Sequence, residues 1–158
     1  MWLAELLLLG LYPTALCTCI GTDIARRIIP NTVIAALLIG FATLAILTPL
    51  PDLSLRLLVA VAVTALGFSL FAENVVGAGD AKLAGVLMLW TDPAQLPLFV
   101  LACGLIGGVV TLAALAMHRP ADRLVGTIAV PGQTIPYGVA LAGAGLLLHP
   151  YSSLLGAG

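Results

Sequence analysis

Long apolar stretches separated by short polar connections run through this chain of 158 residues. Five of them approach the roughly 20 residues that a membrane-spanning helix needs. They are Trp2–Thr22, Thr32–Pro49, Leu53–Ala72, Leu96–Met117 and Ile135–Pro150. A sixth stretch, Ala81–Trp90, is shorter and spans only if the glycine-containing segment from Val75 belongs to it. The pattern predicts an all-α, polytopic membrane protein built as a six-transmembrane-helix bundle.

The composition agrees with a chain that lies mostly within the bilayer. Hydrophobic residues make up 61% and charged residues 8%, whereas soluble domains contain about 25% charged residues. No internal repeat or separate soluble domain is visible, so residues 1–158 are predicted to form a single integral-membrane domain. No basic patch with interleaved aromatic residues indicates nucleic-acid binding. No cysteine or histidine cluster has metal-ligand spacing, so neither a metal nor a cofactor is predicted.

Basic residues gather on one side of the predicted topology. With six spans and the N-terminus outside, the inner connections are 23–31, 73–82 and 118–134. They hold Arg26, Arg27, Lys82, Arg119 and Arg123, and the outer side holds only Arg56. The positive-inside rule then places these connections in the cytoplasm and both termini outside. The N-terminus has no basic leading segment and carries Glu5, which argues against a cleavable signal peptide.

Two carboxylates on the cytoplasmic side carry the candidate chemistry. Asp23 ends the first predicted span and Asp80 begins the fourth. Two carboxylates that approach each other hold one proton between them, because both cannot stay ionised. The ionised member can take a proton from water while the protonated member polarises a peptide carbonyl, as in aspartic proteases. Taken singly, each aspartate is more often a solvated end group or a helix cap.

The residues around Asp80 support either interpretation. Gly77 and Gly79 would leave room for an extended substrate strand, although small residues also serve helix packing in membranes. Lys82 could neutralise a carboxylate or bind substrate, but such a lysine commonly extends to the membrane surface. These residues therefore count as candidate supporting groups of an active site.

The other two inner connections contain further candidate supporting residues. Pro30 ends the first connection, and Asn31 is predicted to cap the second helix. Pro136, Tyr137 and Gly138 interrupt the entry to the last span. Irregular backbone at membrane depth is tolerated where it lines a polar cavity, so this segment either helps to form a substrate groove or simply starts the last helix.

Three of these segments together resemble the motifs of the prepilin and preflagellin peptidases, which are membrane aspartic proteases of the GxGD type. "GAGDAKL" at 77–83 resembles their GxGD-x-K-L signature, "DIARRIIPN" at 23–31 resembles their first motif, and "PYGVAL" at 136–141 resembles their third. All three occur in the family's order across nearly the whole chain. Presenilins and signal peptide peptidases share GxGD, but their Pro-Ala-Leu motif is absent here.

The resemblance implies an aspartic endopeptidase that removes the short N-terminal leader from prepilin or pseudopilin precursors at the cytoplasmic membrane boundary. It implies Asp23 and Asp80 as the catalytic pair, attack by water, no metal, and a multi-pass location in the bacterial cytoplasmic (inner) membrane. Longer bifunctional relatives carry an insert with two cysteine pairs, which is absent between Asp23 and Asn31. The chain therefore resembles the short peptidase-only members of tight-adherence (Flp-type) pilus systems, and N-methyltransferase activity is not expected.

Two other classes of function stay open on the same residues. Carboxylates within a membrane also mark ion pathways, so a small proton-coupled transporter is one alternative, although no inverted repeat is visible. The other alternative is a non-catalytic subunit of a pilus or secretion machine, which requires both aspartates to be dispensable. The inner connection Arg119–Thr134 is a candidate gate or leader-docking element.

Overall fold

A computed structural model describes residues 2–50, 52–117, 137–149 and 154. Within these ranges every regular element is helical, which confirms the predicted all-α class for the described part of the chain. The first helical segment runs through α1 (Trp2–Glu5), a π-helical stretch η1 (Leu6–Leu11) and α2 (Tyr12–Arg26). The others are α3 (Asn31–Leu47), α4 (Leu53–Ala72), α5 (Ala78–Trp90), a short 3₁₀ turn η2 (Pro93–Gln95), α6 (Leu96–Met117) and α7 (Tyr137–Leu148).

Three helical segments are long and apolar enough to cross a membrane. They are Trp2–Arg26, Leu53–Ala72 and Pro93–Ala113. The apolar helices α3 and α7 are shorter, and the 13 residues of α5 rise only about 20 Å at 1.5 Å per residue. The chain is therefore a membrane protein with three candidate spans among its described residues, and the six crossings and the outward termini stay predictions.

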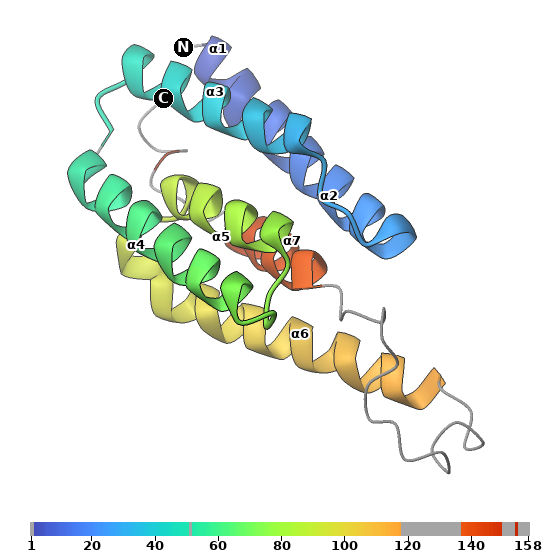
Figure 1. Cartoon of the computed structure of the whole chain (residues 1–158). Helices are drawn as coiled ribbons and strands as arrows, with labels where there is room; N and C mark the ends of the chain where they lie inside the picture. Colours follow the sequence, from blue (N-terminus) through green and yellow to red (C-terminus); the bar gives the residue numbers. More distant parts are fainter. Residues whose placement is uncertain (1, 51, 118–136, 150–153, 155–158) are drawn as a thin grey trace.

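The helices lie in three layers (Figure 1). The N-terminal segment and α3 form one outer layer, α5 and α7 form the middle, and α4 and α6 form the other outer layer. α5 packs most extensively against α4, and α7 contacts α2, α5 and α6. The two shortest helices of the bundle are thus the ones that the longer helices surround.

Small residues allow α4 and α5 to approach each other closely. Ala81 and Gly85 lie one turn apart on α5 and face Gly67 and Thr64 of α4. A Cβ added to Gly67 would lie 2.9 Å from the Cβ of Ala81, and one added to Gly85 would overlap the hydroxyl of Thr64. Helix pairs in membranes use small residues in this way because close backbone contact replaces the hydrophobic driving force that water provides.

A buried ion pair joins the start of α4 to the end of α5. Arg56 is 1% exposed, and its guanidinium group pairs with the carboxylate of Asp92. It also donates to the carbonyl oxygens of Leu89 (3.1 Å) and Thr91 (3.0 Å), at the end of α5 and just beyond it. An unpaired charge in this position would cost several kcal/mol. The pairing explains why an otherwise apolar helix can carry an arginine, and this partner of Arg56 is not among the contacts predicted from the sequence.

Aromatic rings join the end of α5 to α2 and α3. The ring of Trp90 lies 4.8 Å from that of Tyr12 and 5.8 Å from that of Phe41 between centroids. Its Nε1 donates to the carbonyl oxygen of Leu37 at 3.3 Å, which ties α5 to α3. His149, just after α7, stacks on Tyr12 with 4.9 Å between centroids. The end of α5 is therefore tied to α2, α3 and α4.

A candidate active site where α2, α5 and α7 meet

Asp23 lies in the last turn of α2 and is only 5% exposed. Its Oδ2 accepts a hydrogen bond of 3.0 Å from the backbone N–H of Val139, which lies in the first turn of α7. The N-terminus of a helix has N–H groups without partners in the helix and a partial positive charge, so it favours a carboxylate. The contact joins two parts of the chain that are 116 residues apart.

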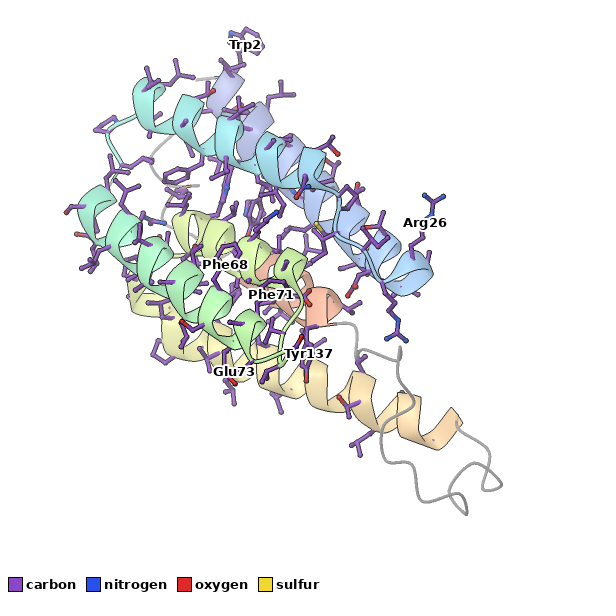
Figure 2. The ribbon with its side chains drawn as sticks, viewed as in Figure 1. Trp2, Arg26, Phe68, Phe71, Glu73 and Tyr137 are labelled. Carbon is purple, nitrogen blue, oxygen red and sulfur yellow. The ribbon has the colours of Figure 1, made fainter. Side chains whose placement is uncertain are left out.

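The helix α2 ends at Arg26, three residues after Asp23, because Arg27 adopts a left-handed backbone conformation, with φ 56° and ψ 34°. Its N–H still donates to the carbonyl oxygen of Asp23 at 3.0 Å, in a terminating geometry that glycine usually provides. Arg26 projects away from the bundle (Figure 2). The chain then turns back so that Ile29 is buried, and Pro30 leads into α3 in an extended conformation.

Ile29 and two glycines bring the three sequence motifs into contact. A Cβ added to Gly138 would lie 2.8 Å from Oδ2 of Asp23 and 2.9 Å from Cδ1 of Ile29. A Cβ added to Gly79 would lie 3.3 Å from the Cβ of Ile29. Ile29 of the first motif therefore packs against the start of α5 and the start of α7. Any side chain at position 138 would displace the Asp23 carboxylate.

Asp80 lies in the first turn of α5, ahead of the apolar stretch of that helix and outside the candidate spans. Its carboxylate interacts with the backbone N–H of Gly77, the N-cap residue, as the acidic member of a capping box does. The negative charge of Asp23 also acts on this carboxylate. The two predicted carboxylates therefore lie within electrostatic reach of each other.

In the described structure the side chain of Lys82 forms its hydrogen bond with a residue of the first motif and not with Asp23 or Asp80. Its Nζ donates to Oδ1 of Asn31 at 3.2 Å, in an exposed position. The predicted capping role of Asn31 is wrong, because Pro30 occupies the N-cap of α3 and Asn31 is the first helical residue. The amide of Asn31 serves instead as an acceptor that ties the start of α3 to α5.

The remaining predicted residues fall at the edge of this group. Gly77 has φ −70° and ψ 146°, so its backbone needs no glycine-specific conformation. A Cβ there would lie 3.0 Å from Oδ2 of Asp80, which gives Gly77 a steric role next to the carboxylate. Tyr137 begins α7 and its side chain is exposed (Figure 2). Pro136 and the connection Arg119–Thr134 lie outside the described residues.

The chemistry that the site offers is proton transfer. In the described ranges no three or more His, Cys, Asp or Glu side chains are grouped as metal ligands. Two coupled carboxylates beside the N-termini of two helices can hold a proton between them and exchange it with a water molecule. Val139 and Ile29, which orient and enclose Asp23, were not predicted from the sequence. The nearest signal was their position inside the segments that also carry the motif residues.

The model of a family described as the type IV leader peptidase family matches residues 10–112. The matched segment is more than half of the chain, includes Asp23 and Asp80, and ends before Gly138. No curated protein and no solved structure matches the chain. The resemblance to prepilin peptidases drawn from the motifs is confirmed at this level: the chain belongs to the type IV leader peptidase family.

Proposed function

We propose that this chain is a membrane-embedded aspartic endopeptidase that removes the short N-terminal leader from prepilin or pseudopilin precursors at the cytoplasmic membrane boundary. Membership of the leader peptidase family supports protease activity of the prepilin type in general. The observation that carries the aspartic assignment is the Asp23 carboxylate, held by the N–H of Val139 and electrostatically coupled to Asp80.

In the proposed reaction the two carboxylates hold one proton. The ionised carboxylate takes a proton from water as the water oxygen attacks the scissile carbonyl carbon, and the protonated carboxylate donates to the carbonyl oxygen. The tetrahedral intermediate then collapses. The C–N bond breaks as one hydroxyl of the intermediate returns its proton to the pair and the amine of the mature protein takes a proton from the pair, and the leader leaves with a new carboxyl group. Water is consumed, no covalent enzyme intermediate forms, and the pair returns to its starting protonation.

The surroundings of Asp23 suit such a mechanism because they fix the orientation of one reacting group. The carboxylate cannot rotate freely while Val139 donates to Oδ2. The absence of a side chain at Gly138 allows the start of α7 to reach it. Orientation of this kind contributes to rate, since a misplacement of about 1 Å can cost around 10²-fold.

We further propose six membrane crossings with the site facing the cytoplasm of a bacterial cell and both termini outside. The end of α2 and the starts of α5 and α7 lie at one end of the bundle (Figure 1). Arg26, Arg27 and Lys82 lie at that same end, as the positive-inside rule requires of the cytoplasmic side. At the other end, the charge of Arg56 is matched by Asp92.

The short connection between Asp23 and Asn31 supports a peptidase without N-methyltransferase activity, of the kind found in Flp-type pilus systems. The function is tested by co-expression with candidate prepilins, with the mobility shift of the precursor as the measurement. The wild-type chain is expected to shorten a cognate precursor. The Asp80→Asn variant is expected to insert into the membrane and leave the precursor uncut. Normal processing by that variant would overturn the assignment.

A further inference from the structure

A groove of about 580 Å³ runs along α5, between α3 and α4. The residues of α5 that line it are Lys82, Gly85, Val86 and Leu89. These positions follow the spacing i, i+3, i+4 and i+7, so they form one stripe along the helix. Lys82 and Asp80 are only two residues apart, and residues two apart on a helix do not share a face. The helix α5 therefore carries the Asp80 carboxylate on one face and the residues that form the floor of this groove on another.

The shape of the groove suits a second helix. From Lys82 to Leu89 it extends along eight residues of α5, whose seven rises of 1.5 Å make about 10 Å or two helical turns. The α4 side is lined by Leu57 and Val61 together with the small residues Ala60, Thr64 and Ala65, and small residues let another backbone come close. Recognition of a helix in a groove uses anchors at i, i+3, i+4 and i+7 over about the same length.

The charge in the groove indicates which helix would fit. Apart from the hydroxyl of Thr64, Lys82 is the one polar side chain among the lining residues, and it lies at the end of the groove nearest the start of α5. Its hydrogen-bond partner Asn31 is uncharged. Among the residues that the structure describes, the one ion pair found joins Arg56 and Asp92. An apolar helix with one acidic side chain near its leader-proximal end would complement this lining.

We propose that the groove between α3 and α4 binds the apolar helix of the precursor, with Lys82 paired to an acidic side chain of that helix. The proposal rests on the proposed peptidase function and names where its substrate is held. The bound helix would leave the groove past Lys82 and continue around the start of α5, which brings the segment before the helix to Asp23 and Asp80. An anionic lipid whose acyl chains fill the groove is the competing occupant.

Site-specific photo-cross-linking locates the occupant. A photoreactive amino acid is placed at Leu38 of α3 or Val61 of α4, which line the groove and are 43% and 67% exposed. Leu105 of α6, outside the groove and 63% exposed, is the matched control. The Asp80→Asn background keeps the precursor uncut. Adducts with the precursor are expected from both groove positions, and at least about tenfold less from Leu105, the ratio that 1.4 kcal/mol of binding preference produces. Adducts with lipid alone, or equal adducts at all three positions, would overturn the proposal.

Kinetics test the same groove in the active protein. Ala65→Leu narrows it and is expected to raise KM for the precursor about tenfold with a much smaller effect on kcat. Ala113→Leu, on an exposed position of α6, is the control and should leave KM unchanged. A wild-type chain that fails to cut the precursor defeats the proposed function itself. A wild-type chain that cuts it, together with equal KM values for the two variants, defeats the groove proposal alone.

A charge exchange tests the role of Lys82. Lys82→Glu is expected to reduce processing of the precursor by about tenfold or more, and replacement of the precursor's acidic residue by lysine should restore most of it, since only a direct pair is rescued by exchange. If the exchanged pair is no better than the single variant, or if a precursor whose acidic residue is changed to glutamine is cut at the full rate, Lys82 does not recognise that charge.

Discussion

Asp23 and Asp92 are both buried aspartates, with 5% and 8% of their surface exposed, but the protein holds them in different ways. Asp92 pairs with the guanidinium group of Arg56, whose remaining donors go to backbone carbonyls. Asp23 accepts from a neutral backbone N–H and lies near the charges of both Arg27 and Asp80, without a direct ion pair to an arginine among the described residues. A carboxylate that a fixed arginine neutralises stays ionised, whereas a carboxylate beside another can share a proton. Both aspartates are buried, so burial does not distinguish their roles. The partner does: an arginine indicates a structural role, and a neighbouring carboxylate indicates a role in proton transfer.

The largest expected effect comes from Asp23→Asn. The amide keeps an oxygen that can accept from Val139, so the fold should persist, but it cannot take a proton from water. We expect kcat/KM for a precursor to fall by roughly 10³-fold or more, as the loss of an essential acid–base group does. The measurement is precursor cleavage by purified protein in membranes, with Asp92→Asn as the matched control.

That control sharpens the comparison between the two aspartates. Asp92→Asn removes the same negative charge at the opposite end of the bundle, so molecules that still fold should cut the precursor at nearly the wild-type rate. Equal losses of cleavage in the two variants, measured per folded molecule, would show that the distinction drawn from their partners is wrong.

The second prediction concerns stability. Asp92→Ala leaves the buried guanidinium group of Arg56 without its carboxylate, and breaking one side of a buried pair costs about 3–5 kcal/mol. We expect a corresponding drop in the free energy of unfolding, measured by denaturant titration in detergent. The double variant Arg56→Met with Asp92→Leu removes both charges and should recover much of that loss. A stability of Asp92→Ala equal to wild type would mean that the pair does not hold α4 to α5.

The third prediction uses two glycines that differ in their surroundings. A Cβ at Gly138 would press on Asp23 and Ile29, whereas a Cβ at Gly104 of α6 would meet nothing within 4 Å. Gly138→Ala is therefore expected to shift the carboxylate and lower kcat by about 10²-fold, the cost of misplacing a reacting group by about 1 Å. Gly104→Ala should cut the precursor normally. If both variants are active, the contact between α7 and Asp23 has no part in the reaction.

The apolar pattern predicts some helix bounds well and others less well, for physical reasons. The bounds Leu53–Ala72 and Leu96–Met117 agree with α4 and α6, because polar or helix-breaking residues flank both stretches. The first segment was predicted to end at Thr22, but it continues to Arg26. Hydropathy marks where side chains stop being apolar, whereas the helix stops where Arg27 takes the left-handed conformation.

The motifs predicted which segments would meet, but not the contacts between them. Their order and shared side indicated that Asp23 and Asp80 would approach each other. The Val139 N–H that holds Asp23 could not be predicted, because every residue offers the same backbone donor. The pair of Arg56 and Asp92 left a usable signal, since an arginine inside an apolar helix requires a partner. Asp92, at the end of another apolar stretch on the same predicted side, was an available one.

The smallest expected effect comes from removing an exposed hydrogen bond between two helices, in contrast to the buried ion pair. The bond between Lys82 and Asn31 is exposed and has a neutral acceptor, whereas the pair of Arg56 and Asp92 is buried and ionic. An exposed bond of this kind contributes about 1 kcal/mol or less. Asn31→Ala should therefore lower the free energy of unfolding by no more than that and slow cleavage less than about fivefold, since 1.4 kcal/mol corresponds to tenfold. Asn31→Asp, which keeps an acceptor for Lys82, should lose less of the free energy of unfolding. A loss of cleavage as large as that of Asp23→Asn would instead place Asn31 among the reacting groups.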